Sequence, residues 1–538
     1  MPFVLLALVA SVPCLPLCAG LISTRWANLH SSHMRRIASF LMTAAFLLAI
    51  ASTCVLIWNG PIDAAVFQSD FLVPISVGVY FDSLSAIMLL LVSFIGCIIT
   101  RFSQRYLEGE ATQGRFLRWI CFTLGSVLLL VVSRNLLMFT GAWMMTSFGL
   151  HQLLTHYSGR AAAILAARKK FVISRLGDIM LVIALVLTYR VFGTLEFSEL
   201  FASAKAMGES TASAPSWSET MVSIIATLFV IGAMTKSAQF PFHTWLPDTL
   251  ETPTPVSALM HAGIINAGGF LVIRLSPLVS LSQTAMIFLS LVGAFTALLG
   301  VVVMMTQTSV KRSLAYSTMA QMGFMMLQCG LGAFSAALLH IVAHSLYKAH
   351  TFLSSGSVLE IAVANRFKSD PISHRRSMFT LIASGALAFA LLAGVGFFAR
   401  LWATESSGVG PGAWVLGMVL AIAATQLIWQ SFMTGHWQVG LRGVVAAAMV
   451  MSAYFAAFLL MDRLLASSVS HSAVAFSTLS MSVVSLVAIG FCLILGLQIA
   501  ITEYSDRPFM RRLYVHASNG FYFDITVQRI VKNFFATR

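Results

Sequence analysis

Long apolar runs recur along the entire sequence, and they limit the chain to one class of fold. A helix needs about 20 apolar residues to cross the ~30 Å hydrocarbon core of a membrane. Barrel strands would instead alternate polar and apolar residues. Since 58% of the residues are hydrophobic and 10% are charged, we predict an all-α polytopic membrane protein of about 15 transmembrane helices. The runs begin near residues 3, 37, 83, 119, 135, 176, 219, 254, 283, 313, 334, 377, 412, 442 and 476.

The basic residues are spread unevenly over the loops, which predicts the orientation. Arg25, the first positive charge, follows the first apolar run, so we expect a retained helix rather than a cleaved signal. With the N-terminus outside, 25 of the 33 Lys and Arg residues lie in inward segments and six in outward ones. The positive-inside rule therefore places the C-terminus in the cytoplasm. The net charge of +14 follows from this topology, and nucleic-acid binding is not needed to explain it.

Two apolar runs contain a basic residue beside a feature that breaks helices. Lys236 precedes Pro241, which removes a helical hydrogen bond, and Arg400 follows two closely spaced glycines. A charge at bilayer depth is costly unless it faces water or a partner, so it indicates a functional position. These runs are the seventh and the twelfth, and an odd separation inverts one relative to the other. The arrangement predicts inverted repeats, each with a discontinuous helix.

This pattern divides the chain into five predicted segments. They are N-terminal transmembrane helices over 1–118, a first repeat over 119–275, a second repeat over 276–435, C-terminal transmembrane helices over 436–500 and a cytoplasmic amphipathic tail over 501–538. The polar segment 196–218 is expected to form an outward loop or a surface helix. Charged inward segments at 101–118 and 362–376, and the tail, suit a cytoplasmic partner, although solvated loops have the same composition.

Three ionisable residues share one face of the eleventh predicted helix. His340, His344 and Lys348 follow one another at intervals of four residues. Desolvated lysines and histidines can exchange protons near neutral pH, which favours a proton relay. Histidines that bond neighbouring helices, with a lysine that extends to the surface, are the alternative. No third ligand accompanies the two histidines and Lys348 would repel a cation, so we expect no metal site and no cofactor in this chain.

Two further residues have two possible roles each. His261 follows a pair of prolines close to the Lys236 segment, so it is either a packing residue or part of the same ion path. Asp178 lies three residues after Arg175, so it either forms a local ion pair or offsets the charge of Lys236. The sequence contains no catalytic constellation, which favours a transport protein over an enzyme.

Several of these segments together resemble the antiporter-type family of the large membrane subunits of respiratory complex I and of Mrp sodium/proton antiporters. The resemblance covers roughly residues 80–405, so the two repeats are antiporter-like. It implies a hydrated polar axis that carries protons and includes Lys236, His261, His340, His344, Lys348 and Arg400. The matching stretches are Lys169–Asp178 (KKFVISRLGD), Lys236–Asp248, Pro253–His261, Lys311–Gly323 (KRSLAYSTMAQMG) and His340–Gly356 (HIVAHSLYKAHTFLSSG).

The sequence departs from the complex I subunits at three places. Met144 stands where those subunits have a glutamate, so the carboxylate that would pair with the lysine is missing. Arg400 occupies the second break, and arginine hardly ever releases its proton in a protein. Only 38 residues, Ile501–Arg538, follow the last predicted span. A lateral helix that braces neighbouring subunits over ~100 Å would need about 70 residues.

These departures fit a branch of the family, the DabB membrane subunits of bacterial inorganic-carbon accumulation complexes. The similar stretches are Arg101–Trp119, AWMMTSFGLHQLL, AARKKFVISRLGD and Arg511–Asp524. The resemblance implies a bacterial inner-membrane protein whose H⁺ or Na⁺ flow drives conversion of CO2 to bicarbonate in a cytoplasmic partner. That partner, DabA, is zinc-dependent and similar to β-carbonic anhydrases. A proton-pumping respiratory subunit and an Mrp-type antiporter remain the alternatives.

The tail is the predicted contact for this partner, because its aromatic and basic residues have no other evident role in the sequence. The residues expected to bind the partner are Arg511, Arg512, Tyr514, Phe521 and Phe523.

Overall fold

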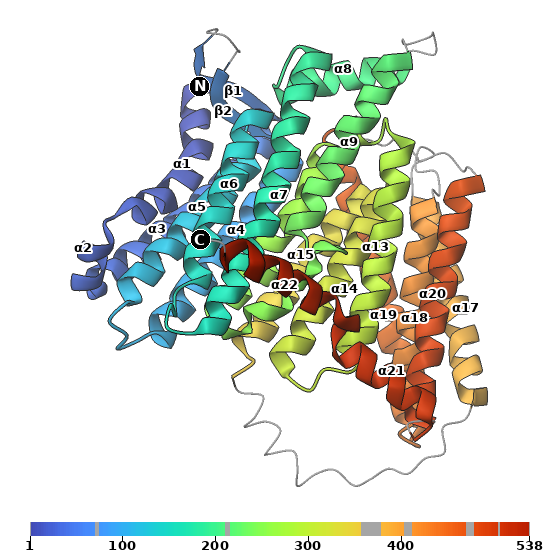
Figure 1. Ribbon diagram of the computed structural model, residues 1–538. Helices are drawn as coiled ribbons and strands as arrows, with labels where there is room; N and C mark the ends of the chain where they lie inside the picture. Colours follow the sequence, from blue (N-terminus) through green and yellow to red (C-terminus); the bar gives the residue numbers. More distant parts are fainter. Residues whose placement is uncertain are drawn as a thin grey trace.

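The computed structural model describes residues 2–69, 75–209, 216–356, 378–402, 411–469, 478–503 and 506–536. Long helices run side by side in a bundle (Figure 1). The first of them are α1 (Pro2–Leu21), α2 (Thr24–Leu29), α3 (Ser31–Asn59), α4 (Ser83–Tyr106), α5 (Gln113–Val132), α6 (Leu136–Leu154) and α7 (Ala161–Phe192). The next are α8 (Phe197–Glu209), α9 (Ser216–Lys236), α10 (Thr254–Ala262), α11 (Ala267–Arg274), α12 (Ser276–Val279), α13 (Gln283–Met304), α14 (Val310–Gly330) and α15 (Phe334–Leu353).

From residue 378 onward, the described residues form four long helices and two short ones. The long helices are α17 (Met378–Trp402), α18 (Pro411–Phe432), α19 (Trp437–Leu465) and α20 (Thr478–Glu503), and the short ones are α21 (Pro508–Ser518) and α22 (Phe523–Ala536). Short 3₁₀ segments are η1 (Phe242–Trp245), η2 (Pro247–Glu251), η3 (Ile264–Asn266) and η4 (Gly520–Tyr522). Each of the predicted apolar runs overlaps a helix. Among the described residues, ten helices are long and apolar enough to cross a membrane, and the count of about 15 crossings stays a prediction.

A β-hairpin interrupts the helical fold, so the prediction of an all-α chain is wrong in this detail. Strands β1 (Ile62–Ser69) and β2 (Ile75–Phe81) pair antiparallel, with a bulge between Ala65 and Phe67. The hairpin lies at one end of the bundle, near α8 (Figure 1). Its strands, of eight and seven residues, are too short to be found by a search for apolar runs of about 20 residues. The surface helix predicted within 196–218 is confirmed by α8.

The discontinuous helices are only partly as predicted. Helix α9 ends at Lys236, and Ala238 has a positive φ of 49°, so the break before Pro241 is confirmed. The predicted break beside Arg400 is wrong, because α17 continues without interruption to Trp402. Glycines lower helix stability but leave the backbone hydrogen bonds intact, and this stretch contains no proline. An unexpected break separates α10 from α11 at η3.

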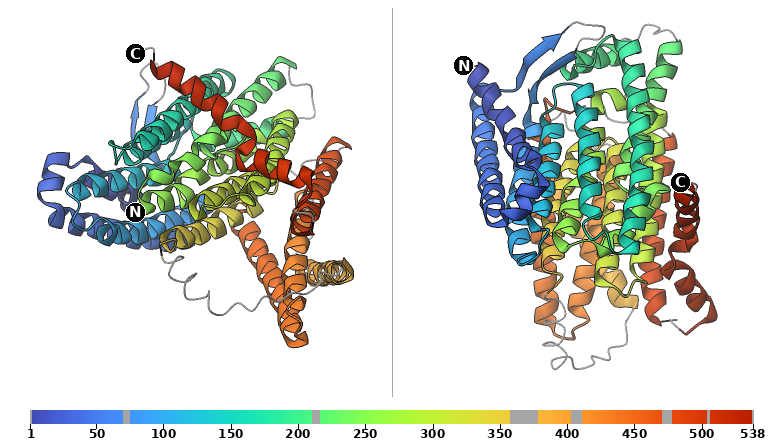
Figure 2. Two further views of the ribbon diagram at one scale, coloured as in Figure 1. Left: turned by 60° about the horizontal axis from the view of Figure 1, so that its bottom comes forward. Right: turned by 60° about the vertical axis from the view of Figure 1, so that its left-hand side comes forward.

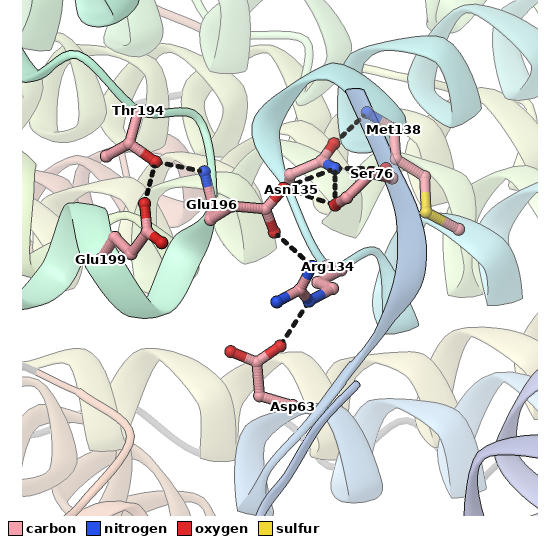
Figure 3. A network of polar contacts seen from close by, with 8 residues as sticks. All are labelled: Asp63, Ser76, Arg134, Asn135, Met138, Thr194, Glu196 and Glu199. Carbon is pink, nitrogen blue, oxygen red and sulfur yellow. Dashed lines mark hydrogen bonds and ion pairs between the residues drawn. The ribbon is translucent and has the colours of Figure 1, made fainter. Parts of the chain in front are cut away.

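A polar network at the hairpin end holds the neighbouring segments in place (Figure 3). Arg134 lies between Asp63 of β1, at 2.5 Å, and Glu196 before α8, at 3.2 Å. Asn135 caps α6 by accepting from the amide of Met138 at 2.8 Å, and its side chain also donates to the carbonyl oxygen of Ser76 at 2.6 Å. Since the cap bonds to β2, the network fixes the start of the helix that carries Trp143 and Ser147.

A buried ion pair joins two distant parts of the main core. The Arg274 guanidinium, at the end of α11, makes a bidentate pair with Asp82 at 2.8 Å and 3.0 Å. Asp82 also caps α4 by accepting from the amide of Ser85 at 2.9 Å. The two side chains are only 1% and 3% exposed, so the pair has little access to solvent. Removal of either partner would leave an uncompensated buried charge.

The tail folds back onto the bundle. Figure 2 shows α21 and α22 crossing the outside of the long helices. Lys169 of α7 is fully buried and pairs with two carboxylates, Asp524 of α22 and Asp248 of η2. The Phe523 ring contacts Phe240 at 5.0 Å between centroids. The tail is therefore attached to the segment that follows the Lys236 break.

Candidate functional site

Lys236 ends helix α9 inside the bundle, and α6 supplies its partners. Its Nζ donates to the carbonyl oxygen of Trp143 at 2.9 Å and to Ser147 Oγ at 3.3 Å. The same nitrogen lies 4.0 Å from the centroid of the Trp143 ring. Residue 236 is only 7% exposed. Polar groups and an aromatic face thus surround the amine inside the bundle, so its position does not depend on contact with lipid headgroups.

Unwound backbone beyond Lys236 connects it to the second break. Ser237 Oγ donates to the carbonyl oxygen of Ile265, in η3, at 2.6 Å. The next residue, Asn266, donates from Nδ2 to Ser345 Oγ of α15 at 2.7 Å. The Ile265 carbonyl belongs to the break at η3, where the interruption of a helix makes backbone carbonyl groups available to side chains. The two breaks therefore face each other through the Ser237 hydrogen bond.

The predicted face of α15 points into the bundle at two of its three residues. His344 and Lys348 are buried, and His340 is half-buried with its ring 6.0 Å from that of His344. His344 Nδ1 bonds Gln321 Oε1. Lys348 Nζ donates to Ser317 Oγ at 2.8 Å and to the carbonyl oxygen of Leu314 at 3.4 Å. Lys348 is buried and hydrogen-bonded to α14, so the alternative in which it extends to the surface is not observed.

His261 belongs to the same cluster. It is buried at the end of α10, and its ring stacks on Phe352 at 4.3 Å between centroids. His344 lies within electrostatic reach of His261, His340 and Lys348. The Nδ1 atom of His261 and the Nε2 atom of His344 have no hydrogen-bond partner among the described residues. Free ring nitrogens in a buried cluster are available to a water molecule or a proton.

Together these residues form two buried polar clusters, and two side-chain hydrogen bonds, Ser237 to Ile265 and Asn266 to Ser345, lie between the clusters. Lys236 is at one end, His344 is at the other, and Ser237, Asn266 and Ser345 lie between them. None of these three intermediates was among the predicted site residues. A lone serine or asparagine in an apolar run gives no specific signal, and only the unexpected break at η3 gives Asn266 its position. A Gly-Ile-Ile-Asn-Ala-Gly-Gly stretch after His261 was the one local signal for that break.

Asp178 lies near Lys236 without bonding to it. Asp178 pairs with Arg175 at 2.6 Å, so the local ion pair that was one of its two expected roles is present. Its carboxylate also acts electrostatically on Lys236, as do Lys170 and Arg175. The second expected role, to offset the charge of Lys236, stays a prediction. Met144, where the resemblance to complex I subunits predicts a glutamate, lines a cavity beside Lys170.

Of the remaining predicted residues, those of the tail lie outside this site. Arg400 belongs to α17, and its side chain lies outside the described part of the structure. In the tail, the Phe523 ring packs on Phe240 and Phe521 packs against the main core, while Tyr514 is 50% exposed. Arg511 and Arg512 are also exposed. The docking segment predicted at 362–376 falls outside the described residues.

Comparison with known families defines the class of protein. Residues 133–402 match the family described as "NADH:quinone oxidoreductase/Mrp antiporter, TM", and residues 70–117 match "NADH-Ubiquinone oxidoreductase (complex I), chain 5 N-terminus". The first match covers half of the chain and includes both breaks and the α15 face. The chain therefore belongs to the NADH:quinone oxidoreductase/Mrp antiporter family of membrane proteins.

Within this family, the chain is similar to subunits of inorganic carbon transporters. It is 35% identical to the "Probable inorganic carbon transporter subunit DabB2" of Halothiobacillus neapolitanus over 98% of this chain and 94% of that protein. It is 40% identical to the "Probable inorganic carbon transporter subunit DabB" of Hydrogenovibrio crunogenus over 64% of this chain and 63% of that protein. The resemblance to this branch is thus confirmed almost end to end.

Solved structures share the fold. One chain of the Mrp complex from Dietzia sp. aligns with 99% of this chain, with a TM-score of 0.56 and 22% identity. The alignment covers 56% of that Mrp chain. The archaeal membrane-bound sulfane sulfur reductase contains one with a TM-score of 0.57 and 19% identity, over 97% of this chain and 99% of that one. At such low identity these matches describe the fold alone.

Proposed function

We propose that this chain is the cation-conducting membrane subunit of an energy-coupled inorganic carbon uptake complex. The chain of buried polar groups from Lys236 through Asn266 to His344 supports this most directly. Lysine, histidine, amide and hydroxyl groups can pass H⁺ when water fills the gaps between them. The similarity to DabB subunits indicates that the substrate of the complex is CO2 or bicarbonate. The catalytic step belongs to another polypeptide in this proposal.

The proposed partner is a cytoplasmic, zinc-dependent subunit similar to carbonic anhydrases, of the DabA type. The relatives are named as transporter subunits, which supports a complex of several chains. We place the complex in the bacterial inner membrane, with the N-terminus in the periplasm and the C-terminus in the cytoplasm. In this orientation the tail and the ion pair of Lys169 lie toward the cytoplasmic end.

The second candidate is a proton-pumping subunit of a respiratory complex or an Mrp-type antiporter. The family match supports it, and so does 37% identity to a chloroplastic NAD(P)H-quinone oxidoreductase subunit 5 of Ranunculus macranthus over 54% of this chain. The absence of a carboxylate at Met144 favours the first proposal. Bicarbonate uptake in cells, measured while the proton and the sodium gradients are collapsed separately, tests the proposal and identifies the ion. Uptake that survives both treatments would contradict cation coupling.

Replacement of His344 by leucine is expected to slow bicarbonate uptake by about tenfold or more, because a relay step typically contributes 10²-fold or more. Leucine has a similar volume but cannot accept or donate a proton. His350→Gln is the matched control, since His350 lies on the same helix and is exposed. If the His344→Leu variant takes up bicarbonate at the rate of the control, this face of α15 has a packing role and takes no part in a proton relay.

Charge reversal on the exposed face of the tail is expected to release the partner. Arg511→Glu with Arg512→Glu changes four units of charge on residues that face away from the bundle. Long-range attraction to an acidic partner surface would then become repulsion. Co-purification from solubilised membranes measures the loss. The exposed Lys205 on α8, at the opposite end of the bundle, provides the control as Lys205→Glu. Retention of the partner by the double variant would show that the tail is not part of the interface.

A further inference from the structure

A half-open cavity between α6 and α7 lies beside the Lys236 site. It has a volume of about 330 Å³, and its walls include Met144, Ser147, His151, Lys170 and Arg175. One water needs about 10–15 Å³ of such space, so the cavity can hold a small ion with several waters. The polar side chains in its walls include two cations and a histidine, and none of the lining residues is acidic.

The polar groups of this cavity have unused hydrogen-bonding capacity. Lys170 is 4% exposed, and its Nζ donates to the carbonyl oxygen of Ser147 at 3.1 Å. Among the described residues, Arg175 Nε and His151 Nδ1 are buried atoms without a hydrogen-bond partner. An ammonium group has three donors and a guanidinium five. Residues with free donors that line one cavity from two helices are suited to an acceptor with several oxygen atoms.

The charge around Lys236 is unbalanced. The groups that act on it most strongly are Lys170, Arg175 and Asp178, so three cationic side chains are accompanied by one carboxylate. That carboxylate is already paired with Arg175. Buried charges in proteins are normally paired, and an excess of this kind is expensive in the interior of a membrane protein. Either a lysine stays neutral or a negative charge enters from outside the chain.

We propose that the cavity between α6 and α7 binds a small monovalent oxyanion of carboxylate type, of the size of bicarbonate or formate, which supplies the negative charge that Met144 does not. The anion accepts hydrogen bonds from Lys170 and Arg175 and lowers the electrostatic cost of a charged Lys236. This inference depends on the charges and the cavity, and it holds whichever ion the chain conducts.

The test uses the full chain, purified in a neutral detergent, with sodium bicarbonate and sodium formate as probes. Millimolar concentrations of either anion are expected to raise the thermal unfolding midpoint, while formamide, which is neutral and similar in shape, leaves it unchanged. Calorimetric titration gives the dissociation constant. Lys170→Met is expected to weaken binding by about tenfold or more, because it removes a charge-assisted hydrogen bond. The exposed Lys205, on α8, provides the control as Lys205→Met.

Met144→Glu gives an independent test that adds a charge instead of removing one. A glutamate at this position brings an internal carboxylate to the cavity, so the variant is expected to bind neither anion and to unfold at the midpoint that the anion-loaded protein has. Arg175→Gln replaces Lys170→Met as the weakened variant if the latter does not fold. Absence of anion binding by the unmodified chain would overturn the proposal and indicate a neutral lysine. Equal responses of Lys170→Met and Lys205→Met, or a response to phosphatidylglycerol alone, would also overturn it.

Discussion

Cells that carry the Lys236→Ala variant are expected to lose bicarbonate accumulation, with uptake falling to the level of cells that lack the chain. Alanine cannot hold or pass a cation, and it leaves the carbonyl oxygen of Trp143 and Ser147 Oγ without the donor they have in the structure. Uptake of labelled bicarbonate measures the effect. The amount of the variant in isolated membranes shows whether insertion is unchanged.

Two further variants separate the possible reasons for this loss. Lys236→Arg keeps a positive charge at the break but hardly ever releases a proton, so it is also expected to be inactive if H⁺ passes through this position. Lys205→Ala removes an exposed lysine from α8 and is expected to retain full uptake. If the Lys236→Ala variant accumulates bicarbonate at the rate of this control, Lys236 is not part of the ion path.

Loss of the Arg274 side chain is expected to have the largest effect on stability. Arg274→Met leaves the Asp82 carboxylate buried without its partner, and breaking a buried pair in this way costs about 3–5 kcal/mol. The free energy of unfolding of the purified protein in detergent is the quantity to measure.

A double variant distinguishes the buried charge from lost packing. Asp82→Asn removes the charge and keeps an acceptor for the Ser85 amide, because asparagine is as good a helix cap as aspartate. Arg274→Met combined with Asp82→Asn is therefore expected to be more stable than Arg274→Met alone. If the double variant were no more stable, the cost would lie in packing, and the pair would contribute little.

The sequence predicts well those features that depend on solvent and on local chemistry. Apolar runs identified the long helices because a membrane requires about 20 apolar residues per crossing. Pro241 correctly indicated the break at Lys236, since proline cannot donate a backbone hydrogen bond. The spacing of His344 and Lys348 predicted that they share one face of α15, and the structure buries both of them there. These predictions use information contained within one segment.

Features that depend on contacts between distant segments could not be predicted in this way. Gly394 and Gly396 indicated a break in α17, but glycine only weakens a helix, and the surrounding residues keep this one continuous. The break at η3 is stabilised by a hydrogen bond that Ser237 donates to Ile265 and one that Asn266 donates to Ser345, and both serines lie far away in the sequence. The tail was interpreted as a contact for a partner alone, because the pairing of Asp524 with Lys169 spans most of the chain.

The shared position of Lys169 has a mechanical consequence. One ammonium group holds Asp524 of the tail and Asp248 of the segment that follows the break at Lys236. A pull on α22 must therefore either separate opposite charges at a buried position or drag η2 with it. A load on α22 is therefore passed, through the Lys169 ammonium group, to the backbone that follows the break at Lys236.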